Sequence, residues 1–374
     1  MECEINMKPN YNKSILSVSS SILKHYGIKS NYKSLNELDI ILKKNYKNVV
    51  FLILDCLGEN IINKNLTGKD ILKNNVITTV TAVFPPTTAA ATTAFHSGLS
   101  PYESGWIGWM PYYKEYDRMI ELFLGTDFYT GEKIPGFLEN NDLNYKTIYE
   151  KICERNTNIK YTKLFPSFEK NGSKTFEELC NKIKIVCENN NKNLISAYWD
   201  EPDRTIHHNG TSSKTTKDVV KNINKTIEKL SKELKDTLII ISADHGAIDV
   251  KEVYLNEIKE IDEYLSKPPS IESRFVSFFI KEGKQKEFYK SFTTKFKDKY
   301  KLYTKQEFID KHLLGKGKKH SRIDSYLGDY IFISKSPLSI RYATTGTKQA
   351  PHLADHAGIT KDEMIVPVIA IECK

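Results

Sequence analysis

Uninterrupted apolar runs that end in an acidic residue recur along the chain. They are KNVVFLILD (47–55), NLISAYWD (193–200), TLIIISAD (237–244) and MIVPVIAIE (364–372). A run without polar alternation is typical of a strand that is buried on both faces of a parallel sheet. The pattern therefore predicts four such strands in one central sheet.

Other segments of the chain have apolar residues at helical spacing. Within 213–235, apolar side chains recur every three or four residues, at Val219, Ile223, Ile227, Leu230 and Leu234. Residues 14–26 and 35–45 have similar spacing. Alternation of strands and helices predicts an α/β fold, specifically a three-layer α/β/α sandwich with a mostly parallel sheet.

One segment departs from this alternation and predicts an insertion. Residues 250–345 contain two strand-like stretches (274–283 and 328–336) around one helix-like stretch (284–300). We expect them to form a small inserted α+β cap at the mouth of the site. The catalytic core then comprises 47–249 and 346–374, and residues 1–46 form a helical segment packed on it.

Composition excludes several classes of protein. The chain has 374 residues, 40% of them hydrophobic, and its net charge of +8 comes mainly from scattered lysines. Without an arginine-rich block we expect no specific nucleic-acid binding. The N-terminus lacks the apolar region of a signal peptide, and VVFLIL is too short to span a bilayer. With six irregularly spaced cysteines, this favours a cytoplasmic protein without membrane association. The oligomeric state stays unknown.

Candidate metal ligands follow two of the apolar runs. Asp55 ends the first, and the pair Asp244–His245 ends the third, before Gly246. Ligands gather outside the carboxyl ends of parallel strands, and carboxylates with imidazoles bind divalent metals. A helix N-cap at Asp55 and a tight polar turn at Asp244 are the alternatives.

Two further clusters carry the same residue types. Asp203 and His207 are four residues apart, so one helical turn would place both on one face, although Asp203 could simply cap a helix. His356 lies in a loop near Gly358, and His352 is its rival as a ligand. With Thr88, described next, these six residues make seven candidate ligands, which suit a site for two divalent metals with a hydroxyl nucleophile between them.

Thr88 is the candidate nucleophile and lies in FPPTTAAATTAFHSG (84–98), where two prolines precede a run of small residues. A hydroxyl at a helix N-terminus lies where backbone N–H groups favour an anion, and a metal would lower its pKa. Thr87, Thr92 and Thr93 are rivals, and an ordinary N-cap is the alternative role.

Together these clusters resemble the alkaline phosphatase superfamily, most closely its nucleotide pyrophosphatase/phosphodiesterase branch, with some likeness to the cofactor-independent phosphoglycerate mutase branch. The matching motifs, in order, are the Asp55 strand end, FPPTT with Thr88 ten residues before Gly98, PDRTIHHNG (202–210), DHG (244–246), and HAG (356–358) before MIVPV. The resemblance covers roughly residues 47–370.

The resemblance implies a ligand set and a mechanism. One metal would be held by Asp55, Thr88, Asp244 and His245, and the other by Asp203, His207 and His356. Zinc suits this mixed nitrogen and oxygen set, and manganese is the alternative. Thr88 would form a phospho-threonine intermediate.

Two departures from the family pattern concern substrate binding. Trp109 stands where an asparagine usually contacts the phosphoryl group, and Ala91 replaces another asparagine. Trp106, Trp109 and Tyr112 could stack on a bulky ester group or merely pack.

The function expected from the sequence is a metal-dependent phosphodiesterase or nucleotide pyrophosphatase that acts on a small phosphate ester or nucleotide. A phosphomonoesterase or phosphomutase on the same metals is one alternative. A non-catalytic binding module is another.

Overall fold

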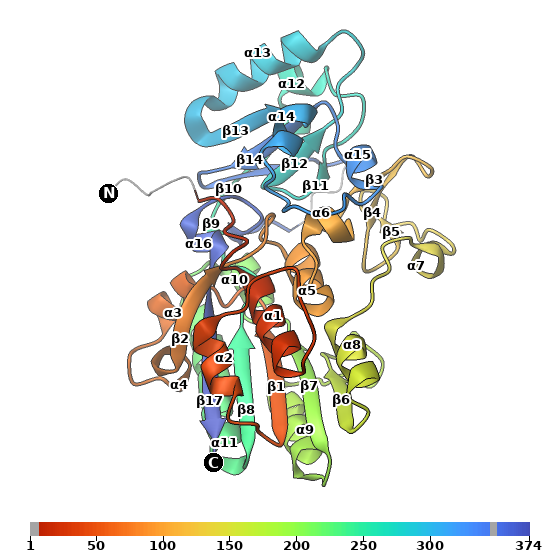
Figure 1. Ribbon diagram of the computed structural model, residues 1–374. Helices are drawn as coiled ribbons and strands as arrows, with labels where there is room; N and C mark the ends of the chain where they lie inside the picture. The colour runs from red at the N-terminus through yellow and green to blue at the C-terminus, as the bar shows by residue number, and fades with distance from the viewer. Residues whose placement is uncertain (1–6, 345–349) are drawn as a thin grey trace.

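A six-stranded sheet forms the centre of the computed structural model, which describes residues 7–344 and 350–374 (Figure 1). All four predicted apolar runs are strands of this sheet. In spatial order its strands are β2 (Val76–Thr81), β17 (Ile365–Cys373), β8 (Thr237–Ser242), β1 (Asn48–Leu54), β7 (Lys192–Trp199) and β6 (Ile159–Leu164).

The direction of β17 differs from the expectation of a parallel strand. The strands β8, β1, β7 and β6 are parallel, but β17 pairs antiparallel with both β8 and β2. The chain reaches Ile365 at the edge where the parallel strands end, so β17 must run back across the sheet. Its residues are buried like those of β8, which is why the apolar pattern alone could not give the direction.

Helices cover both faces of the sheet and complete the predicted three-layer sandwich. Figure 1 shows α1 (Ile15–His25) and α2 (Asn36–Leu42) in front of the sheet, with α9 (Phe176–Glu188) and α11 (Lys214–Glu233) behind it. The helix α11 turns Val220, Ile223, Ile227 and Leu230 inward, while Val219 is half-buried. On the front face α1 also contacts α5 (Thr88–Ser97) and α8 (Ile148–Arg155). On the other face α11 contacts α3 (Glu59–Asn65) and α4 (Ile71–Asn74).

A second sheet lies beyond the carboxyl ends of the parallel strands, at the top of Figure 1. It is antiparallel, in the order β11 (Ser270–Ile271), β12 (Phe275–Phe278), β14 (Tyr330–Ser334) and β13 (Tyr300–Thr304). The helix α13 (Gln285–Phe296) packs Phe288 and Phe292 against it. The division into core and inserted cap stays a prediction, and its boundary at 345 and 346 lies outside the described residues.

Small strand pairs connect the two sheets. One is β10 (Lys251–Tyr254) with β15 (Leu338–Arg341), and the other is β9 (Ile248–Asp249) with β16 (Ala354–Asp355). Residues 112–127 form a three-stranded sheet of β3 (Tyr112–Tyr113), β4 (Arg118–Glu121) and β5 (Thr126–Asp127). Within the described ranges, no helix combines the length and apolarity needed to cross a membrane.

Candidate metal centre and active site

Asp55, Asp244 and His245 converge at the carboxyl ends of β1 and β8, which are neighbours in the sheet. We name these three residues the first ligand group. The His245 Nε2 atom lies 3.3 Å from Asp55 Oδ1 and 3.7 Å from Asp244 Oδ2. All three side chains are buried, so the two carboxylates and the imidazole lie close together away from bulk solvent.

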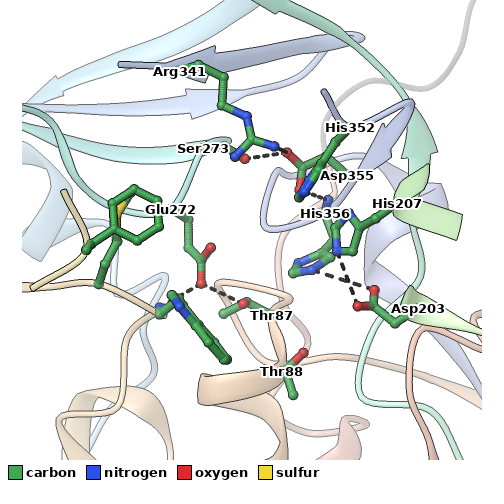
Figure 2. Close-up of a pocket in the computed structure, with 13 residues that line it drawn as sticks. Thr87, Thr88, Asp203, His207, Glu272, Ser273, Arg341, His352, Asp355 and His356 are labelled. Atoms are coloured by element: carbon green, nitrogen blue, oxygen red, sulfur yellow. Dashed lines mark hydrogen bonds and ion pairs between the residues drawn. The ribbon is translucent and has the colours of Figure 1, made fainter. Parts of the chain in front are cut away.

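Asp203, His207 and His356 form the second ligand group. The first two lie on α10 (Asp203–Asn209), where the four-residue spacing places His207 Nε2 3.2 Å from Asp203 Oδ2. The Nε2 atom of His356 lies 3.8 Å from Asp203 Oδ1 (Figure 2). The helical turn predicted for Asp203 and His207 is therefore present.

The two ligand groups adjoin each other. The imidazole rings of His245 and His356 stack with centroids 3.9 Å apart. The pairing of β16 with β9 carries the His356 loop to the edge where Asp244 and His245 lie. The amide of Ala357 donates to the carbonyl of Pro86 at 2.9 Å, which ties this loop to the segment before Thr88. Four distant parts of the chain thus form one site.

The donor atoms of both groups fit divalent metals. The Asp55 Oδ1, Asp203 Oδ1 and Asp244 Oδ2 atoms are buried and have no hydrogen-bond partner among the described residues. Buried carboxylate oxygens are normally paired, and a metal ion is one partner that would satisfy them. The Nδ1 atoms of His207 and His245 lie 2.9 and 3.1 Å from the carbonyl oxygens of Ala354 and Gly246. These carbonyls hold the protons on Nδ1 and leave Nε2 free to bind a metal.

The burial and close spacing of these charged side chains shift their pKa values. Burial, with the negative charges of Asp244 and Asp203, raises the pKa of Asp55 well above its ordinary value. Burial likewise raises the pKa of Asp244 to about 6. For His207, burial acts downward, but the Asp203 carboxylate outweighs it and raises the pKa to about 9. A cation between these groups would offset the repulsion among the carboxylates.

Thr88 and its neighbour Thr87 face different partners. Thr88 is the first residue of α5, and its Oγ1 lies 3.2 Å from His245 Nε2 and 3.4 Å from Asp55 Oδ2. The hydroxyl of Thr87 instead donates to Glu272 Oε1 at 2.6 Å. Of the rival threonines, Thr92 donates its hydroxyl to the carbonyl of Thr88 at 2.6 Å, and Thr93 is buried.

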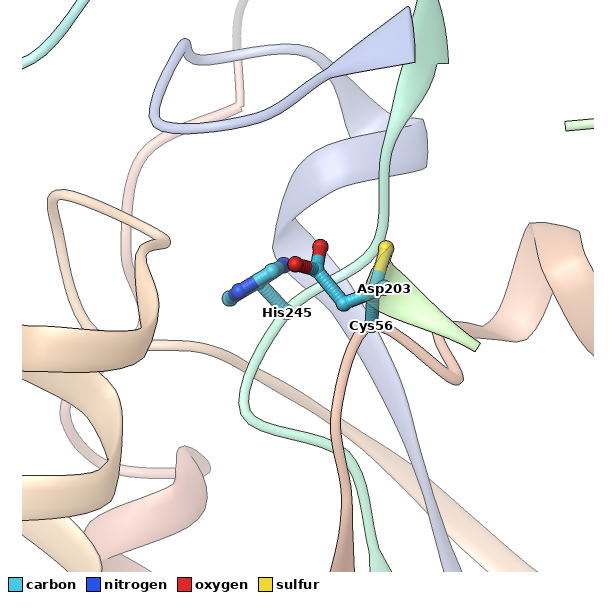
Figure 3. A group of neighbouring side chains, drawn as sticks. All are labelled: Cys56, Asp203 and His245. Carbon is cyan, nitrogen blue, oxygen red and sulfur yellow. The ribbon is translucent and has the colours of Figure 1, made fainter. Parts of the chain in front are cut away.

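Cys56 lies beside both ligand groups. Figure 3 shows its sulfur near Asp203, with His245 on the other side of that carboxylate. Burial raises the pKa of the Cys56 thiol well above its ordinary value, so it is a protonated, weakly polar neighbour of the ligands.

A cavity of about 270 Å³ opens onto Thr88 and the second ligand group. Trp109 lines it, while Trp106 and Tyr112 are not among its lining residues. The indole of Trp106 donates to the carbonyl of Leu143, and the hydroxyl of Tyr112 donates to Asp117. Among the three aromatic candidates, only Trp109 is therefore placed to contact a substrate in this cavity.

Polar residues that sequence reasoning had not selected also line the cavity. They are Glu272, Ser273, Arg341 and Asp355 (Figure 2), together with His352, the rival of His356. One sequence signal was available for Asp355, because the pair Asp355–His356 repeats the order of Asp244–His245. His207, His352 and Asp355 form a further group of possible ligands. Asp355 already accepts hydrogen bonds from the hydroxyls of Ser273 and Ser339, at 2.5 and 2.9 Å.

Known structures share this fold. Structures of ectonucleotide pyrophosphatase/phosphodiesterase 5 align with TM-scores of 0.64. The human structure is 18% identical, and the murine one, an inactive variant in complex with AMP, is 17% identical. Each alignment covers 87% of both chains. At this level of identity they confirm the α/β fold with its mostly parallel sheet.

Sequence comparison identifies the family. The human ectonucleotide pyrophosphatase/phosphodiesterase family member 5 is 32% identical over 149 residues, 37% of this chain and 31% of that protein. The alignment thus spans less than a third of that relative. The family model of type I phosphodiesterases/nucleotide pyrophosphatases matches residues 49–357. The resemblance inferred from the ordered motifs is confirmed, and the chain belongs to the type I phosphodiesterase/nucleotide pyrophosphatase family.

Proposed function

We propose that this protein is a two-metal phosphodiesterase that acts through a phospho-threonine at Thr88. The observation that carries the proposal is the position of the Thr88 hydroxyl. It is the one threonine hydroxyl at the N-terminus of α5 that faces the first ligand group, and it opens onto the cavity beside the second. Each group would hold one divalent metal.

The two ligand groups would hold the metals, while Thr88 would attack the phosphorus atom. When bound, the two metals would draw charge from the phosphoryl oxygens and favour the deprotonated hydroxyl of Thr88. The N-terminus of α5 adds its backbone N–H groups and the positive end of the helix dipole. The Thr88 oxygen forms a bond to phosphorus as the bond to one ester oxygen breaks, and the departing alcohol takes up a proton. Water then cleaves the phospho-threonine and restores the hydroxyl.

Nucleotide esters are the first substrates to consider. The murine relative of similar fold has been seen in complex with AMP as an inactive variant, and the family name covers phosphodiesterases and nucleotide pyrophosphatases. Zinc is the metal that best suits the three histidines and three carboxylates, with manganese as the alternative.

A hydrolysis assay tests the proposal. The protein, reconstituted with Zn²⁺ or Mn²⁺, should hydrolyse a nucleoside nitrophenyl diester, and chelation should abolish the activity. Preference for a nitrophenyl monoester would move the assignment to a phosphatase or mutase. If metal-replete protein binds these esters without hydrolysing any, it is a binding module.

A further inference from the structure

Glu272 is a half-buried carboxylate in the wall of the cavity that Thr88 also lines. Its Oε1 atom accepts two hydrogen bonds, from the hydroxyl of Thr87 at 2.6 Å and from the amide of Trp109 at 2.8 Å. No hydrogen bond to its Oε2 atom is found among the described residues. Figure 2 shows the carboxylate above Thr87, with Asp203 and His207 on the opposite side of the cavity. One carboxylate oxygen is thus fixed while the other is available to a ligand.

The backbone before Glu272 is held in an unusual conformation. Ile271 has φ +84°, which a β-branched residue rarely adopts, and such strain persists only where the surroundings enforce it. Met110 supplies this restraint, since it exchanges hydrogen bonds with Ile271 in both directions, at 2.9 and 3.2 Å. Gly108 lies so close that a Cβ atom there would be 2.5 Å from Ile271 Cγ2. The contacts of Ile271 with Met110 and Gly108 therefore determine the direction in which the Glu272 side chain points.

Arg341 lines the same cavity and is paired with two carboxylates, although its buried Nη2 atom has no hydrogen-bond partner among the described residues. The Arg341 guanidinium donates through Nε to Glu252 Oε1 at 2.8 Å, and its Nη2 lies 4.0 Å from Asp355 Oδ2. Burial lowers the pKa of Arg341 less than Asp355 and Glu252 raise it, so the guanidinium stays charged. Two carboxylates thus pair with this guanidinium, and Glu272 is a further carboxylate that lines the same cavity. A second anionic group on a substrate would meet net negative charge at this end of the cavity.

We propose that Glu272 is a specificity-determining residue that restricts the site to phosphodiesters whose second ester group is uncharged or cationic. This inference rests on the proposed function. Of the two activities in the family name, it favours hydrolysis of phosphodiesters over hydrolysis of nucleotide pyrophosphate bonds. An alcohol or nucleoside group can donate to the free Oε2 atom. A second phosphate, as in a pyrophosphate bond, or the extra charge of a monoester is repelled, because like charges brought together in a binding site disfavour the wrong partner.

The test compares three substrates of one metal-loaded protein. They are a nucleoside nitrophenyl diester, nitrophenyl phosphate and a nucleoside triphosphate, assayed above neutral pH. The key variant is Glu272→Gln, because a glutamine oxygen can still accept from Thr87 and Trp109 while the charge is lost. Asp329→Asn is the matched control. Asp329 is also a half-buried carboxylate that accepts a backbone amide, from Ile280 at 2.8 Å, but it does not line the cavity.

The wild-type protein and the control should both prefer the diester in kcat/KM. Glu272→Gln should narrow that preference at least tenfold against each anionic competitor, about 1.4 kcal/mol in transition-state binding, through faster hydrolysis of the two anionic substrates. Wild-type preference for the triphosphate would overturn the inference and indicate that Arg341 binds a second phosphate. An equal loss for all three substrates in Glu272→Gln would also overturn it, since it would show a structural role only. If the wild type hydrolyses no substrate, the proposed function itself fails.

Discussion

The guanidinium of Arg274 and the carboxylate of Glu363 form a fully buried, two-point ion pair between the second sheet and the core. The Nε–Oε1 and Nη2–Oε2 distances are 2.7 and 3.0 Å, and both side chains are completely inaccessible to solvent. Glu363 also accepts from the amide of Gly358 at 2.6 Å and from that of Thr360 at 3.1 Å. The pair thus braces the loop that presents His356 to the second ligand group.

Breaking this pair should destabilise the protein and disturb its metal site. Glu363→Gln leaves a buried guanidinium without its counter-charge, which costs about 3–5 kcal/mol. We expect this loss in the free energy of unfolding in urea, with weaker metal binding because the His356 loop is less fixed. The control is Glu228→Gln, which removes the exposed Lys232–Glu228 pair and should cost less than about 1 kcal/mol. Equal losses in the two variants would contradict the bracing role.

Replacement of the hydroxyl at position 88 should separate catalysis from folding. Thr88→Ala is expected to abolish phosphodiester hydrolysis while the thermal unfolding midpoint and metal content stay near those of the wild type, since the six other ligands remain. Thr88→Ser keeps a hydroxyl and should retain measurable turnover. An active Thr88→Ala together with an inactive Thr87→Ala would move the nucleophile by one residue.

Glu272 should make the free energy of unfolding of the metal-free protein depend on pH. Burial raises its pKa from the ordinary 4.5 to about 7, with Asp355 adding to the rise and Thr87, Trp109 and His207 opposing it. A raised carboxyl pKa means that the folded state keeps a proton that the unfolded chain releases. The wild type therefore loses stability as pH rises from 4.5 to about 7.

Urea unfolding of the wild type and of Glu272→Gln across this range measures the effect. The variant cannot titrate at this position, so its stability relative to the wild type should rise with pH and level off above about 7. A stability difference that does not change with pH would show that Glu272 titrates normally in the folded protein.

The sequence predicted those parts of the site that are encoded locally. Asp55 and Asp244 each follow a continuous apolar strand, and parallel strands bring their ends to one edge. Asp203 and His207 needed only a helical turn. The direction of β17 was not predictable, because burial on both faces gives the same pattern in either direction.

Residues placed by tertiary contacts were beyond sequence reasoning. Glu272 reaches the cavity because Ile271 pairs with Met110, more than 150 residues earlier in the chain. Arg341 likewise lies in the wall through the pairing of β15 with β10. In contrast, Trp106 looked suitable as an aromatic but is engaged with Leu143 and Phe123. The residue type alone could not show whether an aromatic side chain packs in the interior or contacts a substrate.

Metal content tests the central claim most directly. The protein, purified without chelator and dialysed with Zn²⁺, should carry two ions per chain by elemental analysis, and anomalous diffraction should place one ion in each ligand group. Asp244→Asn should empty the first group and His207→Ala the second, each leaving one ion. A single ion in the wild type, or two ions away from Asp55, Asp203, Asp244 and His356, would contradict the two-metal account.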